Sequence, residues 1–505
     1  MNFVSGITLR GIEAVPVEVE VVASGGMFSI SVVGLPDAAV REARERIRAA
    51  LRTLGVTLRG HISINLAPAD IPKEGALLDL PMAISAACTL GATSVARPSI
   101  FIGELALDGR LRAARGAVPA AILAKRLDMD LYAPEENALE IGLVGGVRAW
   151  KVASLAELIE HLNGSGELRR VEAVVAPDET QPVFVPDFSD IKGQAAAKRA
   201  LEIAAAGHHN ILLAGSPGSG KTMLAGALKG ILPPLSDHEL MDVVLLRSTA
   251  GRPFSLRRER PFRAVHHTAS TVAICGGGGN IRPGEISMAS RGVLFLDEFP
   301  EFARDVLEAM RQPLEDGQIT VSRASGSVTY PAKVLMVAAC NPCPCGYAGD
   351  VDERCKCSPM SLEKYRRKLS GPILDRIDLH LSIPRLTPSE LVSLEGASGE
   401  SSAEARRRVV KARNIQRGRW ACFGIECNSE LTENILRRHI KLNGEIKNFL
   451  TQVLNRTKLS GRGLSRVFRV SRTIADLEGV REIELHHVAE ALSYREGEAL
   501  SWMTR

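Results

Sequence analysis

The segment GSPGSGKT, residues 215–222, constrains the fold of this chain more than any other stretch. The apolar residues NILLA precede it like a buried strand, and the helical pattern MLAGALKGIL follows it. Glycines in such a strand–loop–helix unit let backbone N–H groups surround phosphate oxygens at a positively polarised helix N-terminus. Because every fixed position of G-x-x-x-x-G-K-[ST] is present, the segment predicts a nucleoside-triphosphate site on a P-loop α/β sheet.

The residues of this loop and of a later strand have predicted roles in binding and hydrolysing ATP. Lys221 is expected to reach the β- and γ-phosphates, and the Thr222 hydroxyl to ligate Mg²⁺. Asp297 and Glu298 end the apolar strand GVLFLDEF, so we expect Asp297 to hold Mg²⁺ and Glu298 to activate water. An ordinary solvated acidic pair is the alternative. The predicted nucleotide-binding residues are Gly215, Ser216, Pro217, Gly218, Ser219, Gly220, Lys221, Thr222, Met223 and Asp297.

Three more polar residues are candidates for catalysis. Asn341 ends the apolar strand KVLMVAACN, where its amide would contact the γ-phosphate or the attacking water. Arg376 precedes a strand in SGPILDRIDLHLSIP, and we expect it to reach the nucleotide of a neighbouring subunit. Arg462 begins a C-terminal helix and is a candidate second sensor, with an ordinary surface arginine as the alternative.

Length and patterning divide the chain of 505 residues into several parts, since one ordinary core does not organise so long a chain. Alternating β-rich and helical runs predict an α/β domain first, a Pro-containing linker next, then the P-loop α/β core, and finally a series of amphipathic helices. One of these C-terminal stretches is PSELVSL, residues 388–394. The predicted boundaries are 1–168, 169–188, 189–386 and 387–505.

Charge and hydropathy limit the kinds of partner and the cellular location that the sequence is compatible with. Residues 401–505 contain 20 Lys and Arg against 12 Asp and Glu, although the whole chain has a net charge of only +5. A basic C-terminal segment favours a polyanion such as nucleic acid, or else forms a solvated helical surface. No apolar run reaches the roughly 18 residues of a membrane span, and the N-terminus lacks the pattern of a signal peptide. We therefore expect a cytoplasmic protein without a membrane partner.

The cysteines are concentrated in one segment. Five of the nine lie between residues 340 and 357, in the stretch after the strand that ends at Asn341. Two close pairs, Cys343 with Cys345 and Cys355 with Cys357, predict a structural tetrahedral Zn²⁺ site. Their C-x-C spacing is tighter than the usual C-x₂₋₄-C, so free or redox-active thiols are the alternative.

Four segments together resemble the ComM/YifB family of magnesium-chelatase-like AAA+ ATPases. They are residues 193–225, 262–302, 336–347 and 370–384, and the resemblance covers essentially the whole chain. It implies a ring-forming ATPase, usually a hexamer, that acts as a DNA helicase. Such a helicase drives branch migration in natural transformation and homologous recombination, on single-stranded or branched DNA without sequence preference.

The resemblance also bears on two insertions in the core. Residues 319–334 read as a hairpin that would project into the pore of the ring, where Arg323 would contact DNA phosphates. A brace between subunits is the alternative for this hairpin. His266 and His267 lie in the other insertion, and because they are adjacent we expect them to point in different directions rather than to form a metal pair.

The N-terminal domain suggests rival functions. Residues 71–85 and 103–126 resemble the proteolytic domain of Lon proteases and a related domain of the RadA recombination ATPase. In the Lon pattern a serine nucleophile follows the PKDG-like turn, but here Leu77 stands at that position, so peptidase activity is not expected. The alternative functions are an ATP-dependent protease or a chelatase-type remodelling ATPase acting on a protein partner.

Overall fold

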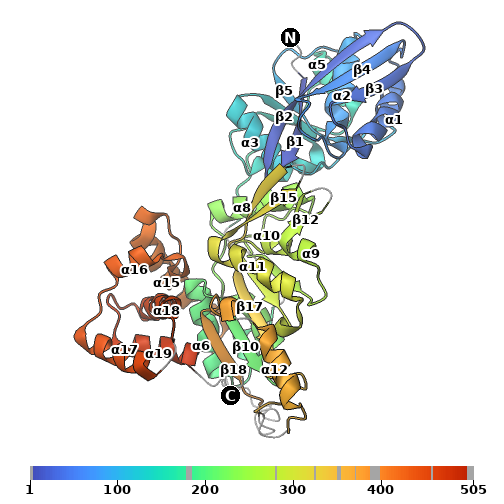
Figure 1. Cartoon of the computed structure of the whole chain (residues 1–505). Helices are drawn as coiled ribbons and strands as arrows, with labels where there is room; N and C mark the ends of the chain where they lie inside the picture. Colours follow the sequence, from blue (N-terminus) through green and yellow to red (C-terminus); the bar gives the residue numbers. More distant parts are fainter. Residues whose placement is uncertain are drawn as a thin grey trace.

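The computed structural model describes residues 4–177, 185–278, 281–323, 326–349, 354–369, 371–386, 399–456 and 459–496. Figure 1 shows an elongated molecule with an α/β part at the N-terminal end, a second α/β part next to it, and helices from the C-terminal region at the side of the second part. Within the described ranges, no helix combines the length and the apolar composition that crossing a membrane requires. The predicted amphipathic stretch 388–394 lies outside these ranges.

The N-terminal part contains a mixed seven-stranded sheet in the order β3-β4-β2-β1-β5-β8-β9. β1 pairs antiparallel with β2 and parallel with β5, so the sheet changes direction at its centre. The strands are β1 (Val4–Arg10), β2 (Glu13–Ser24), β3 (Ser29–Val33), β4 (His61–Ala67), β5 (Ser99–Phe101), β8 (Asp130–Pro134) and β9 (Ala149–Val152), with a separate short pair, β6 (Glu104–Leu105) and β7 (Leu111–Arg112).

Five helices accompany this sheet. In the first of them, Val40, Ala43, Ile47 and Ala50 recur every three or four residues and are buried, and the Asp37 carboxylate caps the start by accepting from the backbone N–H of Val40. The helices are α1 (Ala38–Thr53), α2 (Asp79–Thr89), α3 (Ala117–Leu127), α4 (Ala138–Gly142) and α5 (Leu155–Leu162).

The central part contains a parallel five-stranded sheet in the order β11-β14-β17-β10-β18. In β10, Ile211 and Leu213 face one hydrophobic core while Leu212 and Ala214 face another, as the two-residue period of a strand requires. Both faces of the sheet are therefore covered. The strands are β10 (Ile211–Gly215), β11 (Phe262–Val265), β14 (Val293–Leu296), β17 (Leu335–Cys340) and β18 (Leu379–Ile383).

Helices, a short strand pair and a hairpin complete the central part. The helices are α6 (Ala195–Gly207), α7 (Lys221–Ile231), α8 (Asp237–Ala250), α9 (Thr271–Cys275), α10 (Glu285–Met288), α11 (Arg304–Asp316), α12 (Pro359–Lys368) and α13 (Gly371–Leu374). The short pair is β12 (Gly276–Gly277) with β13 (Arg282–Pro283), and the hairpin is β15 (Gln318–Arg323) with β16 (Gly326–Pro331).

The C-terminal region is helical, as predicted. Apolar residues of its helices, such as Val409, Val470 and Val488, belong to the same hydrophobic core as the α6 and α7 face of the central sheet. The helices are α15 (Ser402–Trp420), α16 (Glu433–His439), α17 (Gly444–Arg456), α18 (Gly461–Glu478) and α19 (Leu485–Glu496). The predicted class, multidomain α/β with a parallel sheet and a helical C-terminal region, is confirmed.

Contacts at α8 and at the hairpin are two of those that join the N-terminal part to the central part. The backbone N–H of Gly116 donates to the carbonyl of Ser248 in α8 at 2.8 Å, and the N–H of Val118 donates to the Ser248 hydroxyl at 3.2 Å. The hairpin makes the second contact, because a Cβ added at Gly11 would lie only 2.4 Å from Cγ1 of Val328. Figure 1 shows this hairpin reaching from the central part to the sheet that contains β1.

Candidate nucleotide-binding site

The segment 215–222 forms a loop between β10 and α7, as the sequence predicted. Gly218 and Gly220 have φ angles of 78° and 88°, in the left-handed region that glycine adopts without strain. The Lys221 ammonium donates to the carbonyl oxygens of Gly215 at 2.7 Å and Ser216 at 2.9 Å. Burial lowers the pKa of Lys221, while the nearby Cys340 and Asp297 act to raise it. A buried cation inside a glycine-rich loop fits a polyphosphate.

The strand β14 brings its acidic residues to the same edge of the sheet. The Thr222 hydroxyl donates to Oδ2 of Asp297 at 3.3 Å, and Oδ1 of Asp297 accepts from the backbone N–H of Glu298 at 2.8 Å. A hydroxyl and a carboxylate side by side are the hard oxygen ligands that Mg²⁺ prefers. We name the side of the sheet where these strands end the carboxyl edge, and the side where they begin the amino edge.

A histidine contacts the predicted water-activating residue. Nδ1 of His267 lies 2.8 Å from Oε2 of Glu298, whose φ of 51° places it in the left-handed region. The ring of His266 lies 4.2 Å from that of His267, measured between centroids. The expectation that these two histidines point apart is therefore wrong, because the loop after β11 places both rings side by side, tilted against each other, next to Glu298. The sequence could not show this, since it depends on β11 being the neighbour of β14.

Asn341 also lies at the carboxyl edge. It follows β17, whose Cys340 pairs in register with Ala214 of β10, one residue before the P-loop begins. Its carbonyl oxygen accepts from the Tyr365 hydroxyl at 2.9 Å, so the main chain at this point is fixed to α12. The structure thus brings together Lys221, Thr222, Asp297, Glu298 and Asn341, which sequence reasoning had assembled from separate motifs.

Arg376 and Arg462 lie at the amino edge. Arg376 comes three residues before β18, which runs parallel to β10, and its Nε donates to the carbonyl of Arg311 at 2.9 Å while the guanidinium also pairs with Glu315. Arg462, in the first turn of α18, lines a cavity of about 560 Å³ together with Asp378. Because a five-residue strand spans roughly 17 Å, neither arginine is next to the P-loop of its own chain.

Comparisons with known proteins agree with this geometry. The family model described as "Magnesium chelatase, subunit ChlI" matches residues 187–391, a second ChlI model matches 19–137, and a model of the ChlI C-terminal region matches 399–495. The competence protein ComM of Haemophilus influenzae is 42% identical over 495 residues, which cover 96% of this chain and 95% of ComM. The chain belongs to the ComM/YifB family.

Two further relatives connect the family to the magnesium chelatases. YifB of Salmonella typhimurium is 41% identical over 491 residues, covering 96% of this chain and 95% of YifB. The magnesium-chelatase subunit ChlI of Synechocystis is 26% identical over 195 residues, covering 34% of this chain and 54% of ChlI. This ComM/YifB chain is therefore an AAA+-type ATPase of the magnesium-chelatase-like group.

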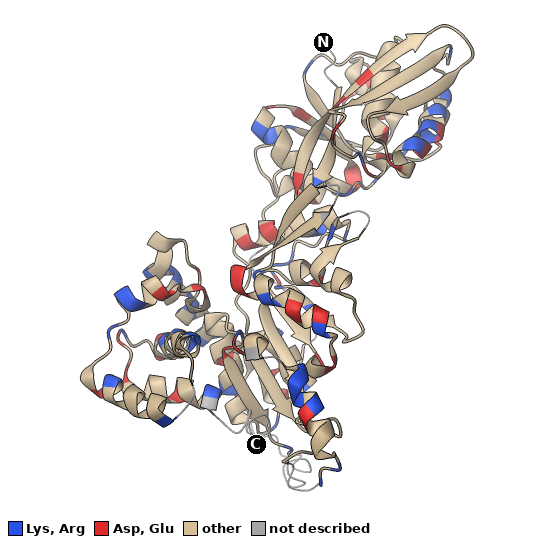
Figure 2. Ribbon diagram, viewed as in Figure 1, with Lys and Arg blue, Asp and Glu red and all other residues tan. Residues whose placement is uncertain are grey.

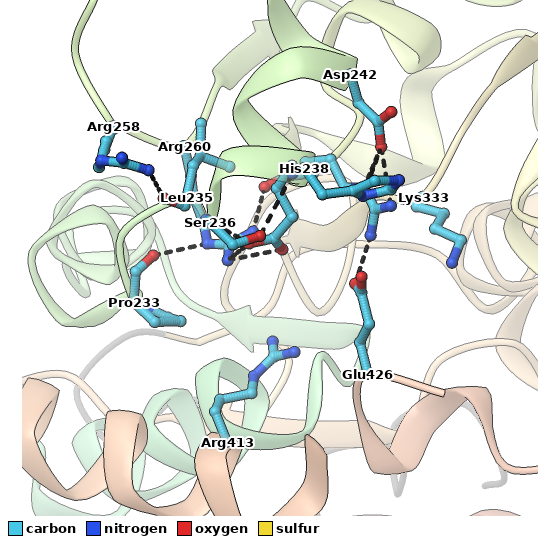
Figure 3. Close-up of polar contacts among 12 residues, drawn as sticks. Pro233, Leu235, Ser236, His238, Asp242, Arg258, Arg260, Lys333, Arg413 and Glu426 are labelled. Atoms are coloured by element: carbon cyan, nitrogen blue, oxygen red, sulfur yellow. Dashed lines mark hydrogen bonds and ion pairs between the residues drawn. The ribbon is translucent and has the colours of Figure 1, made fainter. Parts of the chain in front are cut away.

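The amino edge of this ComM/YifB chain contains a charged network that sequence reasoning missed. Arg260, Arg291, Lys333 and Asp378 each precede one strand of the sheet by one or two residues, and each pairs with a charged side chain. Figure 3 shows several of these contacts around α8. The pairs are Arg260–Glu239 at 2.9 Å, Arg291–Glu426 at 2.5 Å, Lys333–Glu430 at 3.0 Å and Asp378–Arg466 at 2.5 Å.

These pairs fasten the C-terminal region to the sheet. Glu426, Glu430 and Arg466 all come from that region, and Arg417 of α15 adds a contact to Glu239 at 3.3 Å. Burial alone would raise the pKa of Glu239. The charge and hydrogen bond of Arg260, the backbone N–H of Ser236 and the charge of Arg417 together outweigh burial, and the pKa falls from 4.5 to about 2. Arg466 and His209 likewise hold the pKa of the buried Asp378 below its ordinary value against the effect of burial.

Proposed function

We propose that this chain is a Mg·ATP-dependent motor that assembles as a hexameric ring and drives branch migration of DNA in natural transformation and homologous recombination. The observation that carries the proposal is the likeness to the competence protein ComM over 96% of the chain, combined with an ATP site at the carboxyl edge. A relative that matches this chain over 95% of its own length favours a role in competence for this chain as well.

The residues at the carboxyl edge fit ATP and Mg²⁺. Lys221 has only backbone carbonyls and the Ser219 hydroxyl as hydrogen-bond partners within the loop, so it is available to phosphate oxygens. Thr222 and Asp297 would hold Mg²⁺, which supplies positive charge to the β- and γ-phosphates. The run from Gly215 to Met223 would hold the phosphates through its N–H groups at the start of α7.

Hydrolysis would depend on Glu298 and Asn341. Glu298 accepts a proton from water as a general base, and the Asn341 amide orients that water or the γ-phosphate. His267 contacts Glu298 at 2.8 Å in this structure, so the carboxylate must exchange this partner for water before it can act.

The position of the two arginines at the amino edge supports the proposal that the chain assembles as a ring. A guanidinium on the side of the sheet away from its own P-loop can serve only the nucleotide of another subunit, where it would stabilise transition-state charge. Arg376 is proposed for this role, with Arg462 as a second contact from the same edge.

Charge and hairpin geometry support DNA as the substrate. Figure 2 shows Lys and Arg over the C-terminal helices, which agrees with the basic balance of that region. The hairpin has an exposed face of hydroxyl side chains, in which Thr320 contacts Thr329 at 2.9 Å and Ser322 contacts Ser327 at 3.0 Å. Hydroxyls and basic side chains bind phosphates without reading bases.

The test is ATP-dependent branch migration of a synthetic three-strand junction, with Lys221→Ala as the inactive control. We expect the wild-type chain to move the junction and the variant to leave it in place. ATP hydrolysis that DNA does not stimulate, together with no movement of the junction, would overturn the proposal.

A second candidate is a chelatase-type remodelling ATPase that acts on a protein partner, which the matches to ChlI models favour. It predicts ATP hydrolysis that changes with a protein partner and not with DNA, so the same assay separates the two. A protease is less well supported because Leu77, at the position of the Lon nucleophile, is an apolar side chain that is only 3% exposed.

A further inference from the structure

Four cysteine side chains converge beside the nucleotide site. The Sγ atoms of Cys343 and Cys345 are 3.3 Å apart, and Sγ of Cys355 lies 3.7 Å from the first and 3.6 Å from the second. With Cys357 included, all four sulfur atoms lie within 4.8 Å of one another. These distances are far longer than the roughly 2.05 Å of a disulfide, and all four are free thiols.

The arrangement has the dimensions of a tetrahedral metal site. Four sulfur ligands at about 2.3 Å from a zinc ion are about 3.8 Å from each other, which is close to two of the three measured separations. Soft thiolates select Zn²⁺ over Mg²⁺ and Ca²⁺, and four protein ligands leave no open position for chemistry. Cys343 is buried and the other three are half-buried, so the cluster resembles a closed structural site.

The loop that contains Cys343 and Cys345 is also in close contact with the P-loop. Gly346, next to Cys345, has a φ of 89°, and a Cβ added there would lie 2.6 Å from both Cγ and Cδ of Pro217. Its backbone N–H donates to the carbonyl of Cys343 at 2.9 Å, which closes a turn around the first cysteine pair. The first pair is therefore held in a turn whose outer surface is in close contact with the phosphate loop.

The second cysteine pair leads into α12. Ser358 directly follows Cys357 and caps this helix by accepting from the N–H of Ser361, and Tyr365 of the same helix donates to the carbonyl of Asn341. A metal shared by the two pairs would therefore link three parts of the carboxyl edge, namely the P-loop, the strand end at Asn341 and α12.

We propose that Cys343, Cys345, Cys355 and Cys357 bind one structural Zn²⁺, and that this ion holds the turn at Gly346 against Pro217 so that the P-loop keeps its nucleotide-binding shape. The metal site stands on the cluster alone, whereas its effect on nucleotide affinity rests on the proposed ATP site. Zinc content and ATP affinity are therefore measured separately.

The first experiment measures zinc in the purified full-length chain by inductively coupled plasma mass spectrometry. We expect about one zinc per chain in the wild type and in Cys422→Ser, whose exposed thiol lies outside the cluster, and a loss of zinc in the double variant Cys355→Ser/Cys357→Ser. If the double variant does not fold, Co²⁺ exchanged into the wild type replaces it, with tetrahedral thiolate spectra expected. A wild type that neither contains nor takes up zinc, and gives no such spectrum, would overturn the site.

The second experiment tests the link to the P-loop with a fluorescent ATP analogue. We expect chelation of zinc to weaken nucleotide binding about tenfold and added zinc to restore it. Gly346→Ala should retain zinc and still weaken binding, because its methyl group displaces Pro217. Gly349→Ala is the matched control, since Gly349 has a similar φ of 82° and open space around it. Equal affinities with and without zinc would overturn the link while leaving the metal site in place.

Nucleotide binding that is absent from every sample would instead contradict the proposed ATP site. The zinc measurement would still decide the metal site in that case. Failure of this inference and failure of the proposed function therefore give different results.

Discussion

The two edges of the central sheet differ in how their polar residues are partnered. At the carboxyl edge, Thr222 and Glu298 are exposed, and their contacts are single hydrogen bonds or exposed ion pairs. At the amino edge, Arg260 and Glu239 are each about 5% exposed or less, and their charges are fully paired. Thr222 and Glu298, which would exchange partners during a reaction, are thus left accessible, whereas the Arg260–Glu239 pair at the amino edge is buried.

This difference in partners suggests that the carboxyl edge carries out the reaction and that the amino edge holds the C-terminal region in place. An ion pair at the carboxyl edge is weak enough to be broken by a ligand, because exposed pairs contribute only about 0.2–1 kcal/mol. Breaking a buried pair at the amino edge leaves an uncompensated charge and costs about 3–5 kcal/mol. Variants at the carboxyl edge should therefore change catalysis, and variants at the amino edge should change stability, with Arg376 as the exception that joins the two edges between subunits.

The largest effect is expected from Arg376→Ala, which tests that exception. Hydrolysis of ATP should fall about 10³-fold while ATP binding persists, because a transition-state arginine is lost from the neighbouring site. Mixing this variant with Lys221→Ala should restore part of the activity, since each chain supplies what the other lacks. Arg367→Ala, at an exposed pair on α12, is the control. Mixtures that stay as inactive as the separate variants would show that Arg376 does not act between subunits.

Glu298→Gln should have the next largest effect on ATP hydrolysis, and this change affects only the carboxyl edge. Loss of the general base is expected to lower hydrolysis about 10²–10⁴-fold without weakening ATP binding. Lys221→Ala provides the contrast, since it should lose binding as well. Steady-state hydrolysis and binding of a fluorescent analogue give both quantities. Normal turnover by Glu298→Gln would mean that another group activates the water.

Glu239→Gln tests the amino edge and should lower stability by about 3 kcal/mol at pH 7, because Arg260 keeps a buried, unpaired charge. The pKa of Glu239 is about 2 when folded and 4.5 ordinarily, so the unfolded chain takes up the proton first as the pH falls. The difference from wild type should therefore shrink between about pH 4.5 and pH 2.

Urea unfolding across this pH range checks the prediction for Glu239. Glu259→Gln is the matched control, because its pair with Arg257 is far more exposed and should contribute less than about 1 kcal/mol. A constant difference at all these pH values would show that the Glu239 carboxylate charge is not what stabilises the amino edge.

The smallest effect is expected from His267→Ala. Removing the histidine frees the Glu298 carboxylate, so basal hydrolysis should rise by at most about fivefold, the equivalent of one exposed ion pair. His266→Ala is the comparison within the same cluster and should have a smaller effect, since the hydrogen bond of His266 is to Thr268 and its ring only neighbours that of His267. Slower hydrolysis after His267→Ala would indicate that the histidine positions the base rather than competing for it.

The sequence predicted the carboxyl edge well because its residues sit in local patterns. Fewer than ten consecutive residues are enough to recognise the glycine-rich loop after an apolar strand. The same is true of the two acids at the end of another strand. Parallel strands then force their ends to meet, which is why Thr222 lies beside Asp297. The roles of these residues in catalysis remain predictions that the variants above would test.

The amino edge could not be predicted in the same way. Arg291 and its partner Glu426 are 135 residues apart, and neither belongs to a motif. A single arginine before a strand looks the same whether it is solvated or buried. The sequence likewise predicts that a helix begins at Arg462, but it does not show against which edge of the sheet that helix packs.

The route of the chain between Glu298 and Asn341 has a mechanical consequence. After Glu298 the chain passes through α11, runs outward along β15, contacts Gly11 through Val328 of β16, and returns along β16 and β17 to Asn341. The base that would activate water and the amide that would sense phosphate are thus the two ends of one chain segment. The hairpin in the middle of this segment contacts the N-terminal part. A displacement of the N-terminal part would therefore reach Glu298 and Asn341 through the same segment of chain.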